Sequence, residues 1–236
     1  RDGEQFLHQH SMLNLARPSK YALLVVLCIV LFCTAFYAFA FLNIYRQTHP
    51  WMQATLWLCQ HLPAGATIMT EYWDDPLPIH SATGHNGCEK EYVFFTMDMH
   101  AADTEEKVEQ LLDGIEASDY IVLSSQRLYA PISRLPARYA FSSHYYQQLF
   151  AERLGFQLVA APAVYPQLAG ITLLDNPRTE LPLATPSMLA ANWPHGLVFN
   201  LGQADESFTV YDHPQPLIFR KVLRLPRQEL QTLLKP

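Results

Sequence analysis

Residues 103–125 read DTEEKVEQLLDGIEASDYIVLSS, and this stretch predicts a helix that leads directly into a buried strand. Asp103 or Thr104 can cap the helix, and the two glutamates that follow suit the positive end of the helix dipole. The apolar residues that recur at helical spacing are Val108, Leu111, Leu112 and Ile115. The run Asp119–Ser125 is almost continuously apolar, which is typical of a strand buried on both faces of a parallel sheet.

Similar units lie on both sides of this stretch. A helix beginning at Pro50 is followed by predicted strands at 66–70 and 92–96. Downstream, a helix over Phe141–Leu154, with Ser142 or Ser143 as its cap and Gly155 at its end, leads into a strand at 156–160. The alternation predicts a layered α/β domain with a mainly parallel sheet. Beyond it we expect an irregular proline-rich segment at 175–192, strands at 208–211 and 217–219, and a short final helix within 224–236.

The N-terminal part contains a long apolar segment. Residues Tyr21–Tyr45 read YALLVVLCIVLFCTAFYAFAFLNIY and include no Asp, Glu, Lys, Arg or His. About 20 apolar residues in a helix cross a bilayer, and tyrosines at the two ends suit its interfaces. A signal peptide would have a shorter apolar region and a small-residue cleavage site, which Asn43–Arg46 does not offer. We therefore expect one transmembrane helix over residues 21–45.

Flanking charge predicts the orientation of this helix. Arg1, Arg17 and Lys20 precede it, and Arg46 alone follows closely. Positive residues stay on the cytoplasmic side. We therefore expect residues 1–20 to be a cytoplasmic or inter-helix segment, and residues 47–236 to form an extracytoplasmic α/β domain at the plasma membrane of the cell.

The charge of the chain limits its classes of binding partner, and its cysteine content limits the disulfides that it can form. The chain has 16 Lys and Arg residues against 22 Asp and Glu residues, which argues against nucleic acid as a partner. Cys28 and Cys33 lie within the membrane span, so Cys59 and Cys88 form the one pair outside it. A disulfide between them is compatible with an extracytoplasmic location, and two free thiols are the alternative.

No common catalytic signature occurs in the sequence, including GxGxxG, the P-loop, HExxH, GxSxG and CxxC. His80, His85, Cys88 and Glu89 lie close together, but their spacing matches no closed zinc pattern and favours a polar surface loop. We therefore predict no metal site in this chain.

The clearest candidate ligand-binding residues follow the predicted strand at 66–70. Open α/β sheets bind ligands at the carboxyl ends of their strands. Carboxylates there could transfer protons or hold a cation, and the neighbouring aromatic rings could stack on a sugar. A simple turn before Pro76 is the alternative. These candidates are Glu71, Trp73, Asp74 and Asp75, with Tyr72 beside them.

Two further groups are weaker candidates. Arg127 and Tyr129 follow the strand at 119–125 and could bind an anion, although an ordinary ion pair would also explain the arginine. Asp212 and His213 could form a carboxylate–imidazole pair. Because adjacent residues of a strand point to opposite faces, a turn over Asp212–Pro214 is favoured instead.

Seven short segments occur in this order along the chain: Thr48–Trp51, Glu71–Pro78, Ala117–Tyr129, Arg134–Tyr139, Tyr145–Tyr146, Leu154–Phe156 and Phe208–Pro214. Together they resemble the C-terminal region of large polytopic membrane glycosyltransferases of the GT-C type. The nearest group is the YYY-domain membrane protein family of bacteria and archaea, which is related to lipid-carrier-dependent mannosyl- and arabinosyltransferases. The resemblance covers nearly the whole chain from the membrane helix to about Lys221.

This resemblance implies transfer of a sugar from a polyprenyl-phosphate carrier to an acceptor at the outer face of the membrane. In such enzymes the catalytic acidic residue lies in the first external loop, which this chain does not contain. Arg1 stands where Met would begin a complete product, so we expect a C-terminal, non-catalytic part of a longer enzyme. The implied partners are the lipid bilayer, the remaining membrane body of the same protein and a polyprenyl-phosphate sugar. We expect no cofactor in this chain, whereas a divalent cation could serve the full-length enzyme.

Two other functions remain open on sequence. The chain could be a single-pass, membrane-anchored module that binds a carbohydrate or an envelope polymer through Tyr72 and Trp73. It could also be a self-contained glycoside hydrolase, because two suitably spaced carboxylates among Glu71, Asp74 and Asp75 would support that chemistry.

Overall fold

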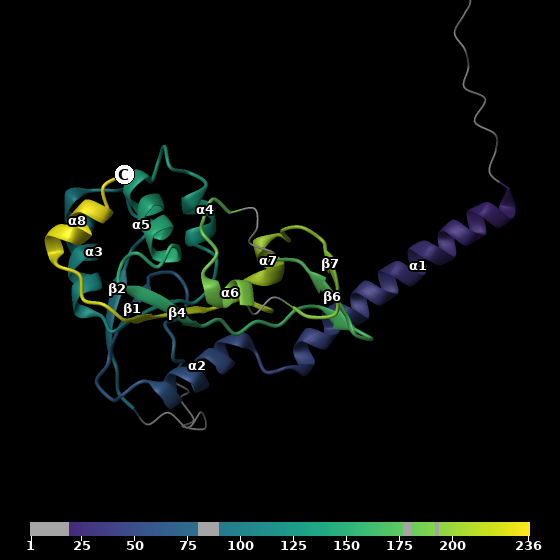
Figure 1. The fold of residues 1–236 in the computed structure, drawn as a ribbon. Helices are drawn as coiled ribbons and strands as arrows, with labels where there is room; N and C mark the ends of the chain where they lie inside the picture. Colours follow the sequence, from purple (N-terminus) through teal and green to yellow (C-terminus); the bar gives the residue numbers. More distant parts are fainter. Residues whose placement is uncertain (1–18, 80–89, 177–180, 192–193) are drawn as a thin grey trace, which may run out of the picture. The chain divides into compact units, whose positions relative to one another are not determined.

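The computed structural model describes residues 19–79, 90–176, 181–191 and 194–236. The chain divides into two compact units, one ending at Ala38 and the other spanning Phe39–Pro236 (Figure 1). Helix α1 (Lys20–Leu42) supplies the first unit and enters the second with its last turn. Its apolar side chains are exposed all around the helix, and by length and composition it is sufficient to cross a membrane.

The second unit is built on a five-stranded sheet in the order β2-β1-β3-β8-β4. The strands are β1 (Thr67–Glu71), β2 (Val93–Met97), β3 (Tyr120–Leu123), β4 (Phe156–Ala160) and β8 (Leu217–Lys221). The β1–β2 and β1–β3 pairs are parallel, whereas β8 is antiparallel to both β3 and β4. The sheet is therefore mixed, and the prediction of a mainly parallel sheet was too simple. The reason is that the last strand enters between β3 and β4, which sequence order would make neighbours.

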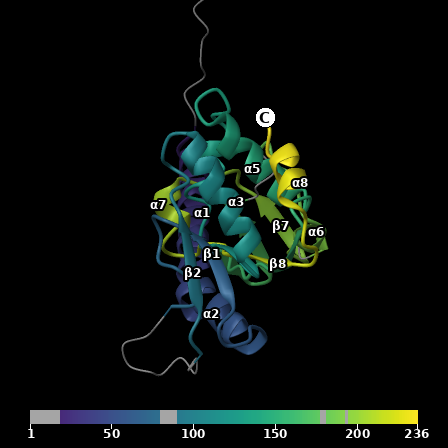
Figure 2. The same ribbon diagram turned by 90° about the vertical axis from the view of Figure 1, so that its left-hand side faces the viewer.

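Helices cover both faces of this sheet. On one face, Met69, Ile121 and Phe219 pack against α3 (Glu105–Ala117), α5 (Ala140–Phe150) and α8 (Arg227–Leu233). Figure 2 shows α3 running beside β1 and β2. On the other face, Ile68, Val122 and Ile218 pack against α2 (Pro50–His61). Because alternate residues of a strand serve opposite faces, β3 must be apolar at every position, and all four of its residues are buried.

A second, smaller sheet follows the first four strands of the main sheet. It has the order β5-β6-β7, and β6 is antiparallel to β5 and parallel to β7. Its strands are β5 (Gln167–Leu168), β6 (Ile171–Leu174) and β7 (Leu197–Asn200), with the short helix α6 (Ser187–Ala191) before β7. The sequence did not predict this sheet, because its strands are very short and proline-rich chain separates β6 from β7.

The strand predicted at 208–211 is wrong. Residues Glu206–Thr209 form the short helix α7, and the chain then turns before β8. Asp205 caps α7, since its side chain accepts a hydrogen bond from the Ser207 backbone N–H at 2.9 Å. This local cap outweighs the strand preference of Phe208, Val210 and Tyr211. The remaining short helix, α4 (Tyr129–Ser133), was likewise not predicted.

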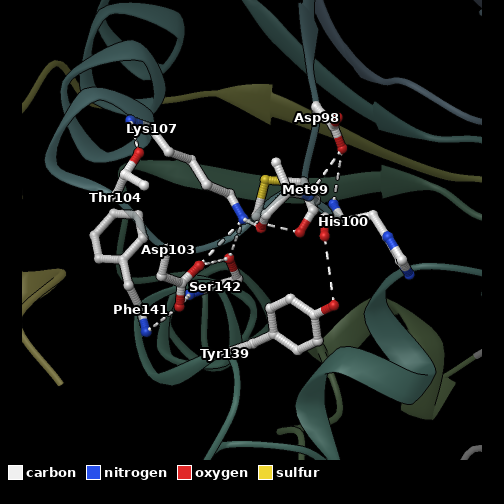
Figure 3. Close-up of polar contacts among 10 residues, drawn as sticks. Asp98, Met99, His100, Asp103, Thr104, Lys107, Tyr139, Phe141 and Ser142 are labelled. Carbon is white, nitrogen blue, oxygen red and sulfur yellow. Dashed lines mark hydrogen bonds and ion pairs between the residues drawn. The ribbon is translucent and has the colours of Figure 1, made fainter.

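A buried lysine joins α3 to α5. Lys107 Nζ lies 2.9 and 2.7 Å from the carbonyl oxygens of Met99 and Ala101, 3.1 Å from Asp103 Oδ1 and 2.7 Å from Ser142 Oγ (Figure 3). Burial lowers the pKa of Lys107, whereas the nearby Asp103 carboxylate acts in the opposite direction. Four acceptors of this kind make the burial of one ammonium group tolerable.

Asp103 is also the cap of α5, in place of the predicted Ser142 or Ser143. Its Oδ2 accepts from the backbone N–H groups of Phe141 at 2.8 Å and Ser142 at 3.1 Å. Thr104, the other residue predicted to cap α3, does so by accepting from the Lys107 backbone N–H. The first N–H groups of α5 are therefore capped by a carboxylate about 38 residues upstream. The local sequence pattern could not indicate such a distant residue, so it predicted the wrong cap.

The start of the second unit is bound to its later segments. After α1, the 3-10 helix η1 (Asn43–Arg46) leads into α2. Phe41 contacts Phe208 edge-on with ring centroids 6.1 Å apart, and the Asn43 side chain donates to the Gln167 carbonyl at 3.0 Å. Tyr45 donates its hydroxyl hydrogen to Asp212 Oδ1 at 2.5 Å. We call residues 39–51 the entry segment.

Asp103→Ala should lower the free energy of unfolding by about 3–5 kcal/mol, because it leaves the Lys107 ammonium buried beside an empty acceptor position and removes the α5 cap. Asp113→Ala is the matched control, since Asp113 forms an exposed ion pair with Arg227 that is worth about 1 kcal/mol or less. Chemical denaturation followed by circular dichroism measures both. Equal losses in the two variants would contradict the assigned role of Asp103.

Candidate functional site

Polar residues converge at the carboxyl ends of β1 and β3. Because these two strands are parallel neighbours, the residues that follow them meet at one edge of the sheet. Ser125 donates its hydroxyl hydrogen to Asp74 Oδ2, and Ser124 donates to the Asp75 carbonyl at 2.9 Å. Arg127 Nη1 lies 2.9 Å from Asp74 Oδ1. We call Glu71, Asp74, Ser125, Arg127 and Glu206 the carboxyl-edge cluster.

Glu71 is the acid of this cluster whose pKa is shifted. The Tyr146 hydroxyl donates to Glu71 Oε1 at 2.5 Å. Burial raises the pKa of Glu71 to about 8, the negative charge of Asp74 adds to the rise, and the Tyr146 hydrogen bond opposes it. Glu71 is therefore mainly protonated at neutral pH, whereas Asp74 is held by a guanidinium and a hydroxyl. Two carboxyl groups in one pocket thus occupy different environments.

Arg127 is fully engaged. Besides Asp74, its Nε lies 2.7 Å from Glu206 Oε1, and its guanidinium lies over the ring of Tyr211 with 4.9 Å between Cζ and the ring centroid. The guanidinium therefore binds two carboxylates and an aromatic face, which matches the ion-pair alternative for this residue. An added anion would have to displace one of these carboxylates.

The pocket inside the cluster is small. Glu71, Trp73, Asp74, Ser124, Ser125 and Leu128 line it. It leaves about 10 Å³ for the centre of a water molecule, which is room for about one water. A sugar ring does not fit there in this conformation, so proton transfer to a buried saccharide is not supported.

Three aromatic rings at this edge are accessible instead. Tyr72 is 63% exposed, Trp73 59% and Tyr211 62%, and we call these three side chains the aromatic rim. Trp73 lies against His100 with ring centroids 5.6 Å apart, which supports one side of the indole. Exposed aromatic faces of this kind suit stacking on a ligand outside the pocket.

The other predicted site residues do not join the pocket. The Asp75 side chain is exposed, and its backbone carbonyl makes the contact with Ser124. Tyr129 is fully buried between Tyr146 and Phe150, with ring centroids 6.3 and 5.1 Å away, so it is a core residue.

Asp212 and His213 point to different surroundings, as expected for a turn. Asp212 accepts from Tyr45, whereas His213 is buried with its Nε2 3.1 Å from Asp175 Oδ2. His213 also contacts Phe41 edge-on, with ring centroids 5.9 Å apart. The acid that pairs with the imidazole is thus Asp175, which lies at the end of β6 and which the sequence analysis did not single out.

The predicted disulfide between Cys59 and Cys88 can be checked at Cys59 alone. Cys59 is disulfide-bonded, and Cys28 and Cys33 are free. Cys88 lies outside the described residues, so its pairing with Cys59 stays a prediction. His80, His85 and Glu89 lie outside them as well. Within the described part of the chain, no group of three or more His, Cys, Asp or Glu side chains is arranged to hold a metal ion.

The sequence analysis missed Tyr146, Glu206 and Tyr211 as members of this site. Glu206 and Tyr211 belong to the chain that returns before β8, about 80 residues after Arg127. No local pattern connects such distant segments. The exposed aromatic residue in a segment rich in charge, Tyr211 beside Asp205 and Glu206, is the one signal that could have indicated them.

Comparison with known proteins identified no relative of this chain. No family model matches the chain, and no curated protein or solved structure matches it.

Glu71→Gln should flatten the pH dependence of stability. Between about pH 4.5 and 8, the folded chain holds a proton on Glu71 that the unfolded chain releases, so the free energy of unfolding of the wild type falls as pH rises through this window. Glutamine resembles the protonated acid and still accepts from Tyr146. We therefore expect the variant to gain stability relative to wild type as pH increases from 5 to 8.5.

Thermal unfolding across this pH range measures the effect. Asp75→Asn is the matched control, since it neutralises an exposed carboxylate in the same loop. Parallel wild-type and Glu71→Gln profiles would show that Glu71 ionises freely in the folded state.

Proposed function

We propose that residues 47–236 form an extracytoplasmic accessory domain of a membrane glycosyltransferase that uses a polyprenyl-phosphate sugar. In this proposal α1 anchors the domain in the plasma membrane, and the catalytic acid belongs to another part of the enzyme. The carboxyl-edge cluster and the aromatic rim contact the saccharide of the donor or acceptor.

The observation that carries this proposal is the contact between the carboxyl edge and the entry segment. Trp51 Nε1 donates to the Ser124 carbonyl at 2.7 Å, and His49 Nε2 lies 2.9 Å from the Tyr211 carbonyl. The ligand-binding edge typical of an α/β sheet is therefore built against the chain that directly follows the apolar helix. In this proposal, that contact ties the edge to the residues that follow the anchor, where a sugar on a membrane lipid is presented.

The chemistry of the edge supports binding more than catalysis. The pocket admits about one water, Arg127 is already paired, and three aromatic rings remain exposed. Aromatic stacking combined with carboxylate and hydroxyl hydrogen bonds is a common way to hold a polar ring without reacting with it. A self-contained hydrolase is correspondingly disfavoured.

Trp73→Ala should weaken binding of the lipid-linked sugar about tenfold, equivalent to about 1.4 kcal/mol, because the largest exposed ring of the rim is lost. The measurement is titration of the whole chain in nanodiscs with polyprenyl-phosphate mannose and polyprenyl-phosphate arabinose. Leu135→Ala is the control, since Leu135 is exposed in another loop. Unchanged affinity in Trp73→Ala would show that the aromatic rim does not contribute to binding of the sugar.

The same titration distinguishes the proposed accessory domain from an alternative function. The exposed rings also fit a single-pass anchored module that binds an envelope polysaccharide. Free oligosaccharides that bind as tightly as the lipid-linked sugars would favour that module. A preference for the lipid-linked sugars would favour the accessory domain.

The orientation can be tested in intact cells. A cysteine introduced as Leu223→Cys, with Cys28 and Cys33 replaced by serine, should react with a membrane-impermeant maleimide without cell lysis, because Leu223 is exposed on the domain placed outside. Labelling that requires lysis would place the domain in the cytoplasm and contradict the proposed location.

A further inference from the structure

Several exposed apolar side chains of the second unit lie on β7, α7 and η1. Leu197, Phe199 and Leu201 alternate along β7 and the residue after it, so they lie on one face of an edge strand. Phe208 of α7 is also exposed, as is Tyr45 of η1. Figure 1 shows β6, β7 and α7 at the end of this unit opposite α3 and α8. We call Tyr45, Leu197, Phe199, Leu201 and Phe208 the apolar end.

The structural elements that bear the apolar end also contact the entry segment. Phe41 contacts Phe208, the Asn43 side chain donates to Gln167 of the β5-β6-β7 sheet, and Tyr45 donates to Asp212. The exposed apolar residues thus lie on the structural elements packed around the end of α1. If α1 spans a bilayer, these elements are the part of the domain next to the lipid.

We infer that the apolar end inserts into the lipid interface of the membrane that α1 spans, an inference that rests on the membrane anchoring in the proposed function. Soluble domains rarely leave several large apolar side chains together in water. Leu and Phe side chains with a tyrosine at the boundary are suited to the interface.

The charge around the apolar end indicates the kind of contact. The acidic residues Asp205, Glu206 and Asp212 accompany it and outnumber the neighbouring bases Arg46 and Arg127. Anionic lipid would repel these groups, so insertion is driven by apolar burial and not by attraction to charged head groups. Among the described residues β7 is an edge strand, which also limits the depth, because unpaired peptide groups are not tolerated in hydrocarbon. The contact is therefore shallow, at the level of the head groups and the first methylene groups.

Spin labelling of the whole chain in phosphatidylcholine nanodiscs tests this inference. In a background with Cys28 and Cys33 replaced by serine, labels are placed at Leu197→Cys, Phe199→Cys and Leu223→Cys, and at Val30→Cys within α1. Leu197 and Leu223 are matched, since both are leucines and are 55% and 59% exposed. Collisions with oxygen, which enters lipid, are compared with collisions with a water-soluble nickel chelate.

Labels at 197 and 199 should favour oxygen, at a shallower depth than the label at 30, whereas the label at 223 should favour nickel. Addition of anionic phosphatidylserine should not strengthen the oxygen preference at 197 and 199, because this lipid repels the acidic groups around the apolar end. Nickel access at 197 and 199 equal to that at 223, with a deep label at 30, would overturn the inference and leave the anchoring intact. Shielding of 197 and 199 from both reagents would show that protein covers the face and would also overturn it. Nickel access at 30 would instead contradict the anchoring itself.

Discussion

The position of β8 between β3 and β4 is the constraint on which the second unit depends. Ile218 and Phe219 are fully buried and serve opposite faces of the sheet, so both hydrophobic layers include this one strand. Backbone hydrogen bonds from β8 close the sheet on both of its sides. The chain between β4 and β8 must therefore leave the sheet and return, and that excursion forms the small sheet, α7 and the turn at Asp212. Glu206 and Tyr211 reach Arg127 because they lie on this returning chain.

Buried Lys107 and partly buried Glu71 are stabilised by different physical means. Lys107 is surrounded by four oxygen acceptors, including one carboxylate, so its charge is balanced within the core. Glu71 has a single hydroxyl partner and a nearby negative charge, and it therefore retains a proton. The first arrangement stabilises the junction of two helices. The second leaves a neutral carboxyl group beside the ionic pair of Asp74 and Arg127, where proton uptake is coupled to folding.

Local pattern was sufficient for most elements of the first two-thirds of the chain. The apolar spacing of α3, the continuous run of β3 and the run at Phe156–Ala160 each carry their own signal, and the structure confirms them. Two of the failures involve distant partners, and a third involves a local cap. Asp103 caps α5 across about 38 residues, β8 enters the sheet from the far end of the chain, and Asp205 turns 206–209 into a helix. Likewise, the edge position of Glu71 and Asp74 follows from strand order, whereas the contacts of Glu206 and Tyr211 with Arg127 could not be predicted.

The central place of β8 has a consequence for biosynthesis. Until residues 217–221 have been synthesised, β3 and β4 each have an unpaired edge, and the hydrophobic layers on both faces of the sheet are incomplete. Pairing such as Ile121 with Phe219 joins parts of the chain that are far apart, which makes closure slow relative to local helix formation. The domain can therefore complete its fold only once residues 217–221 are available, and until then the incomplete sheet is prone to aggregation.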